Sequence, residues 1–244
     1  MSVDSSRELQ KLYEGRFGPD REYRRAVWRT LIDSYFQREI RSDTTVLDLG
    51  CGYGEFINQI HCGSKFAMDL NPDSPSLLAS DIKFLPQDCA APWPIPDGSL
   101  DVVFTSNFFE HLPDKSALSR TLDNVRRGLK SGGRLIALGP NIRYLPGAYW
   151  DFWDHFIPLT ELSLSEVLKM KGFRIESCIP RFLPYSMSTG GNPPLFFVRL
   201  YLKFAPLWPL FGKQFLVVAR KKKRVQDGAA LDGDSAAGAA QPQS

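Results

Sequence analysis

Residues 46–56 read VLDLGCGYGEF, an apolar run that leads into three glycines at alternate positions, Gly50, Gly52 and Gly54. Glycine adopts backbone conformations that other residues avoid, and it lets a bound molecule approach the main chain without meeting a Cβ atom. In open α/β sheets, ligands bind beyond the carboxyl ends of the strands. A strand that runs directly into such a turn therefore predicts a ligand-binding site there. The opposing interpretation is that the glycines only form a tight turn.

Short apolar runs alternate with stretches of helical periodicity over most of the chain. Several runs are apolar at consecutive positions, which is typical of strands in a parallel sheet covered on both faces. We expect strands at 45–49, 65–69, 82–85, 100–105, 134–138, 173–178 and 213–220. We expect helices at 21–40, 54–61, 115–129 and 161–171, with residues 131–133 closing the third. This alternation predicts a doubly wound α/β domain.

The cysteines and histidines form no recognisable metal-binding or disulfide pattern. None of the four cysteines, Cys51, Cys62, Cys89 and Cys178, is paired with another at C-x-x-C spacing. No N-terminal stretch combines a basic start with an apolar run, as a signal peptide would. We therefore expect reduced thiols, no bound metal and a cytoplasmic protein.

The charge of the chain is concentrated near its C-terminal end. The net charge is +3, but residues 220–224 alone supply five positive charges and the tail after them carries three aspartates. Without both segments, residues 1–219 keep a net charge of only +1. A nearly neutral body gives no sign of a phosphate-binding face, so we expect no nucleic-acid partner.

An acidic residue, Asp69, ends the second expected strand, 19 positions after Gly50. A carboxylate at this place can accept hydrogen bonds from both ribose hydroxyls of a nucleoside. Folds that bind dinucleotides usually space their glycines as G-x-G-x-x-G, whereas the third glycine comes one residue earlier here. The pattern predicts a ligand that contains a nucleoside, without saying which one.

Four stretches of the sequence resemble the motifs of class I S-adenosylmethionine-dependent methyltransferases of the small bacterial type. They are VLDLGCGYGEF (46–56), AMDLNPD (67–73), LPQDCAAPWPIPDGSLDVVFTSNFFEHLPD (85–114) and LKSGGRLIALGPN (129–141), and together they span about 44–141. The resemblance implies a Rossmann-like sheet of seven strands, mostly parallel, with the last strand antiparallel. It implies a class I methyltransferase domain at 21–224, with a cofactor-binding core at 44–141 and acceptor-side elements at 142–212. We expect residues 1–20 to be mobile and residues 225–244 to be a disordered tail.

The same resemblance assigns the cofactor, S-adenosyl-L-methionine, to particular residues. Asp69 would bind the ribose, Asp88 the adenine amino group, and Asn107 would lie near the methionine part. The complete expected set is Asp48, Gly50, Cys51, Gly52, Gly54, Asp69, Leu70, Asp88, Cys89 and Asn107. Two members have alternatives: Asp48 could orient the glycine turn without touching the ligand, and Asp88 could be a solvated loop acid. The pair Glu110–His111 resembles one that lines the cofactor pocket in the family, although a packed structural histidine is an equal alternative for His111.

The segment AYWDFWDHF (148–156) follows the fifth expected strand, where this fold builds its acceptor side. If the acceptor is a hydroxyl, its proton must leave, and histidine is the side chain best suited to take it near neutral pH. We predict His155 as this base, oriented by Asp154 or Asp151, with Tyr149, Trp150 and Trp153 around the acceptor. The alternative is that the aromatic residues form a lid packed on the sheet. His155 would then be hydrogen-bonded to a carboxylate and would have no catalytic role.

The segment LFFVRLYLKFAPLWPLF (195–211) is too short and too interrupted by charges and prolines to span a membrane. It could lie at a membrane interface with the help of the basic run 220–224, cover the acceptor site, or pack between protomers. Membrane contact, at the inner face, would favour a lipid-linked or glycan-type acceptor over another small molecule. Small methyltransferases of bacterial cell-surface polysaccharide pathways contain stretches that resemble YWDFWDH and GKQFLVVARK.

Two other functions compete with an O-methyltransferase. An NAD(P)-dependent reductase would require a different interpretation of the glycines, and the sequence lacks a Tyr-x-x-x-Lys pair after the fourth strand. A methyltransferase-like module that binds cofactor without catalysis would be expected to have a degraded glycine motif or to lack the ribose acid, and both are present. The sequence does not indicate the oligomeric state.

Overall fold

The computed structural model describes residues 20–185 and 192–223. The predicted mobile segment, apart from Asp20, and the predicted disordered tail lie outside these ranges. The described strands are β1 (Thr45–Leu49), β2 (Ser64–Met68), β3 (Ile82–Leu85), β4 (Leu100–Ser106), β5 (Leu129–Pro140), β6 (Phe173–Leu183) and β7 (Gln214–Lys221). The described helices are α2 (Arg21–Ser34), α3 (Ser74–Leu77), α4 (Lys115–Gly128), α5 (Glu161–Met170), α6 (Leu195–Lys203) and α7 (Trp208–Phe211). Short 3₁₀ turns are η1 (Phe36–Arg38), η2 (Phe109–His111), η3 (Ile142–Tyr144), η4 (Ala148–Asp151) and η5 (Ala205–Leu207).

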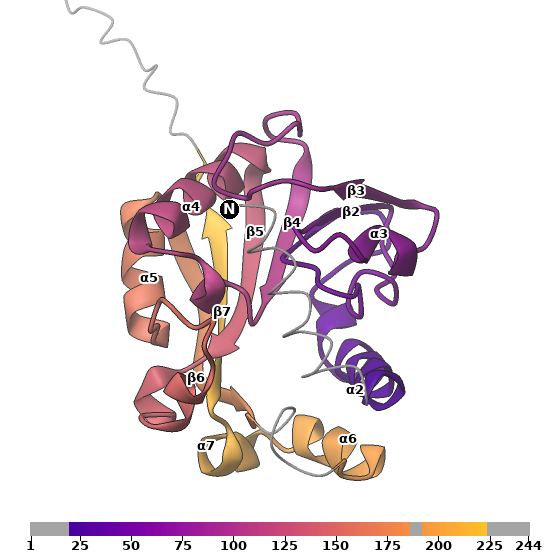
Figure 1. Cartoon of the computed structure of the whole chain (residues 1–244), viewed down its shortest axis with the longest axis vertical. Coiled ribbons are helices and arrows are strands. Elements are labelled where there is room, and N and C mark those ends of the chain that lie inside the picture. Colours follow the sequence, from indigo (N-terminus) through magenta and orange to yellow (C-terminus); the bar gives the residue numbers. More distant parts are fainter. Residues whose placement is uncertain (1–19, 186–191, 224–244) are drawn as a thin grey trace, which may run out of the picture.

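The strands form one seven-stranded sheet in the order β3-β2-β1-β4-β5-β7-β6 (Figure 1). β7 runs antiparallel to both of its neighbours, and the other neighbouring pairs are parallel. The predicted mostly parallel α/β sheet with an antiparallel last strand is therefore confirmed. The chain proceeds outward from β1 to β3 and then returns to β4 beside β1. This reversal creates the switch point at which open α/β sheets bind their ligands.

Apolar side chains cover both faces of the sheet. Successive residues of a strand point to opposite faces, and β1 shows the result. Val46 packs in a cluster with side chains of α2, whereas Leu47 packs in a second cluster with side chains of α4 and α5. Figure 1 shows α4 and α5 at one side of the sheet and α2 at the other. Burial on both faces explains why this strand is apolar at consecutive positions.

Local signals fix the starts of two helices. The Asp114 side chain accepts a hydrogen bond of 2.7 Å from the Ala117 backbone N–H at the start of α4. Thr160 and Ser163 form a reciprocal capping box at the start of α5. Each cap satisfies backbone donors that have no partner within the helix. The expected helices at 115–129 and 161–171 are therefore confirmed to within one residue at each end.

The helix expected at 54–61 is wrong, because this segment forms consecutive turns. The backbone N–H groups of Asn58 and Ile60 bond to oxygens four residues back, but that of Gln59 bonds to an oxygen three residues back. The Asn58 side chain also bonds to the backbone at Leu77 and Ala79, at the end of α3. These contacts hold the segment in an irregular form, so no helix N-terminus follows the glycines.

Three other boundaries differ from expectation, and one of them is the end of β6, which was expected at residue 178 and lies at Leu183. The helix expected at 21–40 ends at Ser34 and continues as the 3₁₀ turn η1. β5 begins at Leu129, before the residues predicted to close the preceding helix, because Leu129 pairs with Leu100 of β4.

The segment 195–211 divides into α6, η5 and α7, and Pro206 and Pro209 each lie in the first turn of a new element, where proline is tolerated. Among the helices of the described ranges, none has both the length and the apolar character needed to cross a bilayer.

Candidate functional site

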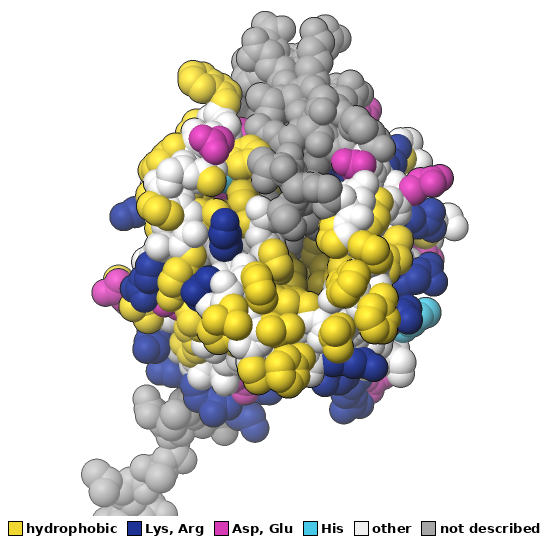
Figure 2. Space-filling view, turned by 90° about the horizontal axis from the view of Figure 1, so that it is seen from below, with side chains coloured by type: hydrophobic (Ala, Val, Ile, Leu, Met, Phe, Trp, Pro, Cys, Tyr) yellow, Lys and Arg dark blue, Asp and Glu magenta, His cyan; other side chains and the backbone are white. Residues whose placement is uncertain are grey.

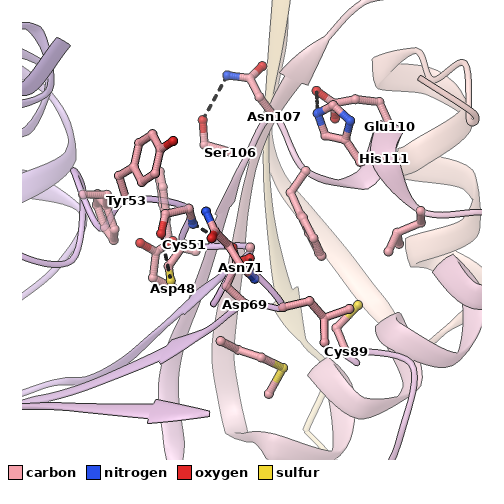
Figure 3. A pocket seen from close by; sticks show the side chains of 18 of the residues that line it. Asp48, Cys51, Tyr53, Asp69, Asn71, Cys89, Ser106, Asn107, Glu110 and His111 are labelled. Atoms are coloured by element: carbon pink, nitrogen blue, oxygen red, sulfur yellow. Dashed lines mark hydrogen bonds and ion pairs between the residues drawn. The ribbon is translucent and has the colours of Figure 1, made fainter. Parts of the chain in front are cut away.

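A cavity of about 460 Å³ opens at the carboxyl ends of β1, β2 and β4. Its walls come from the turn after β1, the loops after β2, β3 and β4, the segment around His155, and α2. Figure 3 shows Asp48, Cys51, Asp69 and Asn71 grouped at one side and Glu110 and His111 at the other. The cavity therefore has two chemically different ends, which are described in turn.

The glycine turn forms the first wall, and all three of its glycines have positive φ, which residues other than glycine rarely adopt. The backbone at Gly50 has φ +72°, and a Cβ atom there would lie 2.2 Å from the Phe108 ring. The backbone at Gly52 has φ +52°, and a Cβ there would meet nothing within 4 Å. Because Gly52 lines the cavity, its missing side chain leaves space for a ligand against the main chain. Gly54 packs near Asn58 and Leu78 and does not line the cavity.

Asp69 lies directly after β2 and is bound to the glycine turn. Its Oδ2 accepts a hydrogen bond of 2.7 Å from the Gly52 N–H, and its Oδ1 accepts one of 2.8 Å from the Asn71 N–H. Burial raises the pKa of Asp69, and the backbone hydrogen bonds lower it in part. An ionised carboxylate has about four acceptor sites. The two backbone bonds therefore leave acceptor capacity that ligand hydroxyls can use.

The neighbouring acid, Asp48, is buried under the turn with 3% of its surface exposed. Burial raises the pKa of Asp48 well above its usual value, and the charges of Asp69 and Glu55 act in the same direction. Cys51 is also buried, and burial likewise raises the pKa of its thiol. Both residues line the cavity.

The loops after β2 and β3 contribute the next predicted residues. Leu70, 45% exposed, and Asp88, also exposed, line the cavity at its rim. The Asp88 Oδ1 accepts a hydrogen bond of 2.8 Å from the Ala90 N–H, which fixes the loop. Cys89 lines the cavity but is buried, and its Sγ lies 3.2 Å from the Thr121 Oγ1 of α4. Burial raises the pKa of Cys89 to about 11, so its thiol is protonated near neutral pH.

Asn107 follows β4 in a left-handed conformation, with φ +47°. Among the described residues it is the one non-glycine residue with positive φ, and asparagine tolerates this region better than most residues. Its side-chain amide donates a hydrogen bond of 3.3 Å to the Ser106 Oγ, while its Oδ1 is buried without a hydrogen-bond partner. A buried acceptor without a donor is costly, and this one belongs to a residue of the cavity wall.

His155 lies at the second end of the cavity and is buried. Its Nδ1 lies 2.8 Å from the Tyr149 carbonyl oxygen. Since a carbonyl can only accept, Nδ1 carries the hydrogen, and in the neutral ring Nε2 has the lone pair. His155 was predicted to be oriented by an aspartate, but this hydrogen bond goes to the backbone. The Asp154 carboxylate instead lies against His111, with 3.2 Å between Asp154 Oδ2 and His111 Nδ1.

The aromatic residues predicted around the acceptor do not line the cavity. Tyr149 is fully buried, and its hydroxyl donates a hydrogen bond of 2.5 Å to the Ile157 carbonyl. Trp150 and Trp153 are exposed to 57% and 85%, because η4 and the turn after it direct them outward. Phe152 and Tyr185 provide the aromatic lining in their place.

Glu110 and His111 complete the second end, together with His155. The Glu110 Oε1 is buried without a hydrogen-bond partner and lies 4.0 Å from the His111 Nε2. Burial raises the pKa of Glu110 to about 7. Burial acts to lower the pKa of His111, but its hydrogen bond to Asp154 and the charges of Glu110 and Asp154 raise it overall. One potential ligand atom from each of Glu110, His111 and His155 lies within 4.8 Å of the other two.

Sequence reasoning identified one wall of the cavity and missed others. Arg24 and Trp28 of α2 line it, and Arg24 forms an ion pair of 3.1 Å with Glu55, another lining residue. No motif signals this contribution, because α2 precedes the first strand and approaches the site only in the folded chain. Glu110 was recognised only as half of a pair beside the cofactor, although its position after β4 could have suggested a site residue.

The chain was compared with known proteins. Residues 47–137 match a family model described as a methyltransferase domain. A 2-methyl-6-phytyl-1,4-hydroquinone methyltransferase of Synechocystis sp. is 30% identical over 119 residues, which cover 46% of this chain and 36% of that protein. A probable S-adenosylmethionine-dependent methyltransferase of Mycolicibacterium smegmatis is 28% identical over 143 residues, which cover 56% of this chain and 54% of that protein. The matches therefore span between about a third and about half of these relatives' own length.

A solved structure has the same fold. The crystal structure of an S-adenosylmethionine-dependent methyltransferase from Archaeoglobus fulgidus superposes with a TM-score of 0.60 at 23% sequence identity. The superposition covers 87% of this chain and 99% of that one.

Proposed function

We propose that the chain is an S-adenosylmethionine-dependent methyltransferase that acts on an oxygen atom, because residues 47–137 match a family model described as a methyltransferase domain. The observation that carries the proposal is the contact between Gly52 and Asp69 at the edge of the cavity. This contact places the Gly52 main chain, which carries no Cβ atom, beside a carboxylate that can still accept further hydrogen bonds. This is the arrangement that a nucleoside ligand requires.

The residues along the first wall fit S-adenosylmethionine. We assign the ribose hydroxyls to Asp69, the adenine amino group to Asp88 beside Leu70, and the methionine part to the region of Gly50, Gly52 and Asn107. Two observations support this placement: the space left at Gly52 and the unpartnered acceptor Oδ1 of Asn107. The amino group of the cofactor would supply the hydrogen-bond donor that Asn107 lacks.

When bound, the cofactor supplies a methyl group on a positively charged sulfur; the carbon–sulfur bond breaks with its electron pair staying on sulfur, and a bond from carbon to the acceptor oxygen forms. The protein mainly has to hold the acceptor in line and to remove the proton of an acceptor hydroxyl. We assign the proton removal to the second end of the cavity, formed by Glu110, His111 and His155. His155 is the base that the sequence predicted. Asp154 contacts His111 and not His155, so any effect of Asp154 on proton removal passes through His111.

We propose that the acceptor is lipid-linked or glycan-type. α6 and α7 expose large apolar side chains, including Phe196 at 68% and Phe211 at 57%. Figure 2 shows apolar side chains gathered on one face of the molecule, with Lys and Arg side chains around them. Such a face suits the interface of an anionic membrane, and we propose contact with the inner face of a membrane from the cytoplasm. The Synechocystis relative is named for a hydroquinone that carries a phytyl chain, which supports an apolar acceptor.

Two alternative functions predict different results for ligand binding and methyl transfer. An NAD(P)-dependent reductase would bind NADH tightly and S-adenosylhomocysteine not at all. A non-catalytic module would bind S-adenosylhomocysteine but transfer no methyl group. The domain match favours neither the reductase nor the module.

The proposal is tested by calorimetric titration of the protein with S-adenosylhomocysteine and, separately, with NADH. Methyl-labelled S-adenosylmethionine is then added with a host-cell extract, which is divided into protein, nucleic-acid, lipid and soluble fractions. We expect S-adenosylhomocysteine binding and label in the lipid or soluble-glycan fraction. Binding of NADH alone would overturn the proposal, and label only in protein or nucleic acid would overturn its acceptor class.

A further inference from the structure

Gln214 is a buried polar residue of the cavity wall that neither the assigned cofactor site nor the proton removal uses. It is the first residue of β7, has 3% of its surface exposed, and lines the cavity. Its Nε2 donates a 2.7 Å hydrogen bond to the Pro184 carbonyl oxygen, whereas its Oε1 is buried without a hydrogen-bond partner. Because a carbonyl oxygen can only accept, this bond settles which end of the amide is the nitrogen.

The unpartnered oxygen calls for a donor from a bound molecule. Pro184 does not line the cavity, so the bond from Nε2 leaves Oε1 as the polar atom of this side chain that a ligand can meet. A buried acceptor without a donor is costly. A ligand that brings a donor to Oε1 removes this cost. The amide is uncharged, which favours a neutral donor such as a hydroxyl, since burial of an ammonium group without a counter-charge would be costly in turn.

The strand order places Gln214 away from the assigned cofactor site. β7 lies two strands from β4 and three from β1, and through β5 its start is level with the end of β4. With neighbouring strands about 4.8 Å apart, the start of β7 is about 10 Å from the end of β4 and about 14 Å from that of β1. Alternate strand residues share a face of the sheet, so Gln214 lies on the face of Leu216, which packs in one cluster with Trp28 of the cavity wall.

Aromatic rings line the same side of the cavity. Tyr185 follows Pro184, and the centre of its ring lies 5.8 Å from that of Phe152, which stacks on the His155 ring at 4.9 Å. All three rings belong to lining residues. The hydrogen bond from Gln214 to Pro184 ties β7 to the loop that carries Tyr185. One uncharged acceptor atom is therefore built into the wall that also carries the predicted base, His155.

We propose that Gln214 determines the acceptor specificity: its Oε1 accepts a hydrogen bond from a second hydroxyl of the acceptor, one that is not methylated. This inference rests on the proposed function and states what an O-methyltransferase with this cavity requires of its acceptor. The acceptor is then at least a diol, in which one hydroxyl loses its proton and takes the methyl group while the other is held at Gln214. An aromatic diol with a lipid chain and a glycan both have this chemistry. Gln214 contacts the acceptor and not the reacting atoms, so it acts on binding and orientation.

The experiment measures the binding of matched probes to the full chain saturated with S-adenosylhomocysteine, by calorimetric titration. The first set is 2-octyl-1,4-hydroquinone with 2-octylphenol and 3-octylphenol, each of which lacks one of its hydroxyls. The second set is octyl β-glucoside with its monodeoxy analogues. A site that hydrogen-bonds a hydroxyl discriminates against the compound that lacks it. In at least one set we expect wild type to bind the full compound about tenfold or more tightly than a deoxy compound, and the set that shows this preference distinguishes an aromatic diol from a glycan.

The substitution Gln214→Met keeps the length of the side chain and replaces the amide by a thioether, which is only a weak acceptor. It should remove the preference by weakening the full compound and leaving the deoxy compound unaffected, whereas a packing defect would weaken both alike. The matched control is Gln37→Met. Gln37 also donates from Nε2 to backbone oxygens, those of Ile40 and His61, but lies outside the cavity, so its variant should keep the wild-type preference.

Urea unfolding checks that each variant is folded, and Gln214→Leu takes the place of the methionine variant if that one is not. A wild-type chain that binds the members of each set equally, or binds none of them, overturns the proposal without any variant. A preference that persists in folded Gln214→Met also overturns it, as does a tenfold loss of S-adenosylhomocysteine affinity there, which would give the oxygen to the cofactor. The proposed function fails on a different observation: wild type that binds no S-adenosylhomocysteine removes the methyltransferase, and the probe preference is then measured on the chain alone.

Discussion

The Gly52 N–H donates a 2.7 Å hydrogen bond to the Asp69 Oδ2, and this bond joins the turn after β1 to the end of β2. The acid expected to bind the ribose therefore also shapes the turn beside it. Ligand binding and local order at this edge of the sheet depend on the same carboxylate.

Asp69→Ala should weaken S-adenosylhomocysteine binding at least tenfold, or by about 1.4 kcal/mol, because ribose hydroxyls and the Gly52 N–H both lose their acceptor. Calorimetric titration measures this loss. Asp81→Ala is the control, since Asp81 is exposed and forms only a 3.8 Å ion pair with Lys65. Equal affinities for wild type and Asp69→Ala would exclude Asp69 from the binding site.

Alanine at the two glycines should affect stability and binding differently. A left-handed conformation costs a non-glycine residue about 1–2 kcal/mol, and Gly50→Ala adds a clash with the Phe108 ring worth about 1–3 kcal/mol more. Gly52→Ala has only the conformational cost, but its methyl group occupies ligand space. Urea unfolding should therefore show the larger loss for Gly50→Ala, whereas folded Gly52→Ala should lose S-adenosylhomocysteine affinity. The reverse order of stabilities would contradict this account.

His155→Ala should lower methyl transfer by roughly 10²- to 10⁴-fold, the usual contribution of a group that assists proton removal. S-adenosylhomocysteine affinity should be kept, because His155 lies at the other end of the cavity from Asp69. Turnover and binding are measured on the same preparation, with His61→Ala as the matched histidine control. Unchanged turnover would leave His155 with a packing role.

The four cysteines should react with iodoacetamide at different rates in the native protein. Cys178 is exposed, whereas Cys51 and Cys89 are buried and burial raises the pKa of each thiol. Little reactive thiolate is then present at pH 8. Mass spectrometry of the alkylated peptides should show Cys178 modified first and Cys51 and Cys89 only after unfolding. Early modification of Cys51 would show that the turn opens in solution.

Phe196→Ser together with Phe197→Ser should reduce binding to vesicles that contain anionic lipids. These side chains are exposed on α6, and their removal takes apolar area from the proposed interface. Co-sedimentation compares the double variant with Met170→Ser, which removes an even more exposed apolar side chain from α5. Vesicle binding that is equal in all three proteins would leave the apolar face without a membrane role.

The sheet was predictable because consecutive apolar residues and their spacing reflect burial on both faces, as at Val46 and Leu47 of β1. The first end of the cavity was predictable for a related reason: Gly52 and Asp69 lie at fixed distances from strand ends. Of the residues predicted to bind the cofactor, Gly54 alone does not line the cavity, because it is packed against its neighbours in the turns.

The second end was not predictable in this way. His155 was identified from its residue type, but its hydrogen bond to the Tyr149 carbonyl and the contact of Asp154 with His111 depend on how two loops meet. The helix expected at 54–61 failed because the Asn58 side chain bonds to the backbone near α3. Such contacts between distant segments have no periodic signature.

The Tyr23 hydroxyl of α2 donates a 2.7 Å hydrogen bond to the Pro193 carbonyl oxygen, just before α6, across 170 positions of the chain. Closing a loop of this length costs chain entropy, so this contact depends on the rest of the fold to hold α2 and the start of α6 side by side. α2 also supplies Arg24 and Trp28 to the cavity. A ligand that fills this cavity therefore binds the chain with α2 in place, and stabilises that form over any in which α2 is detached.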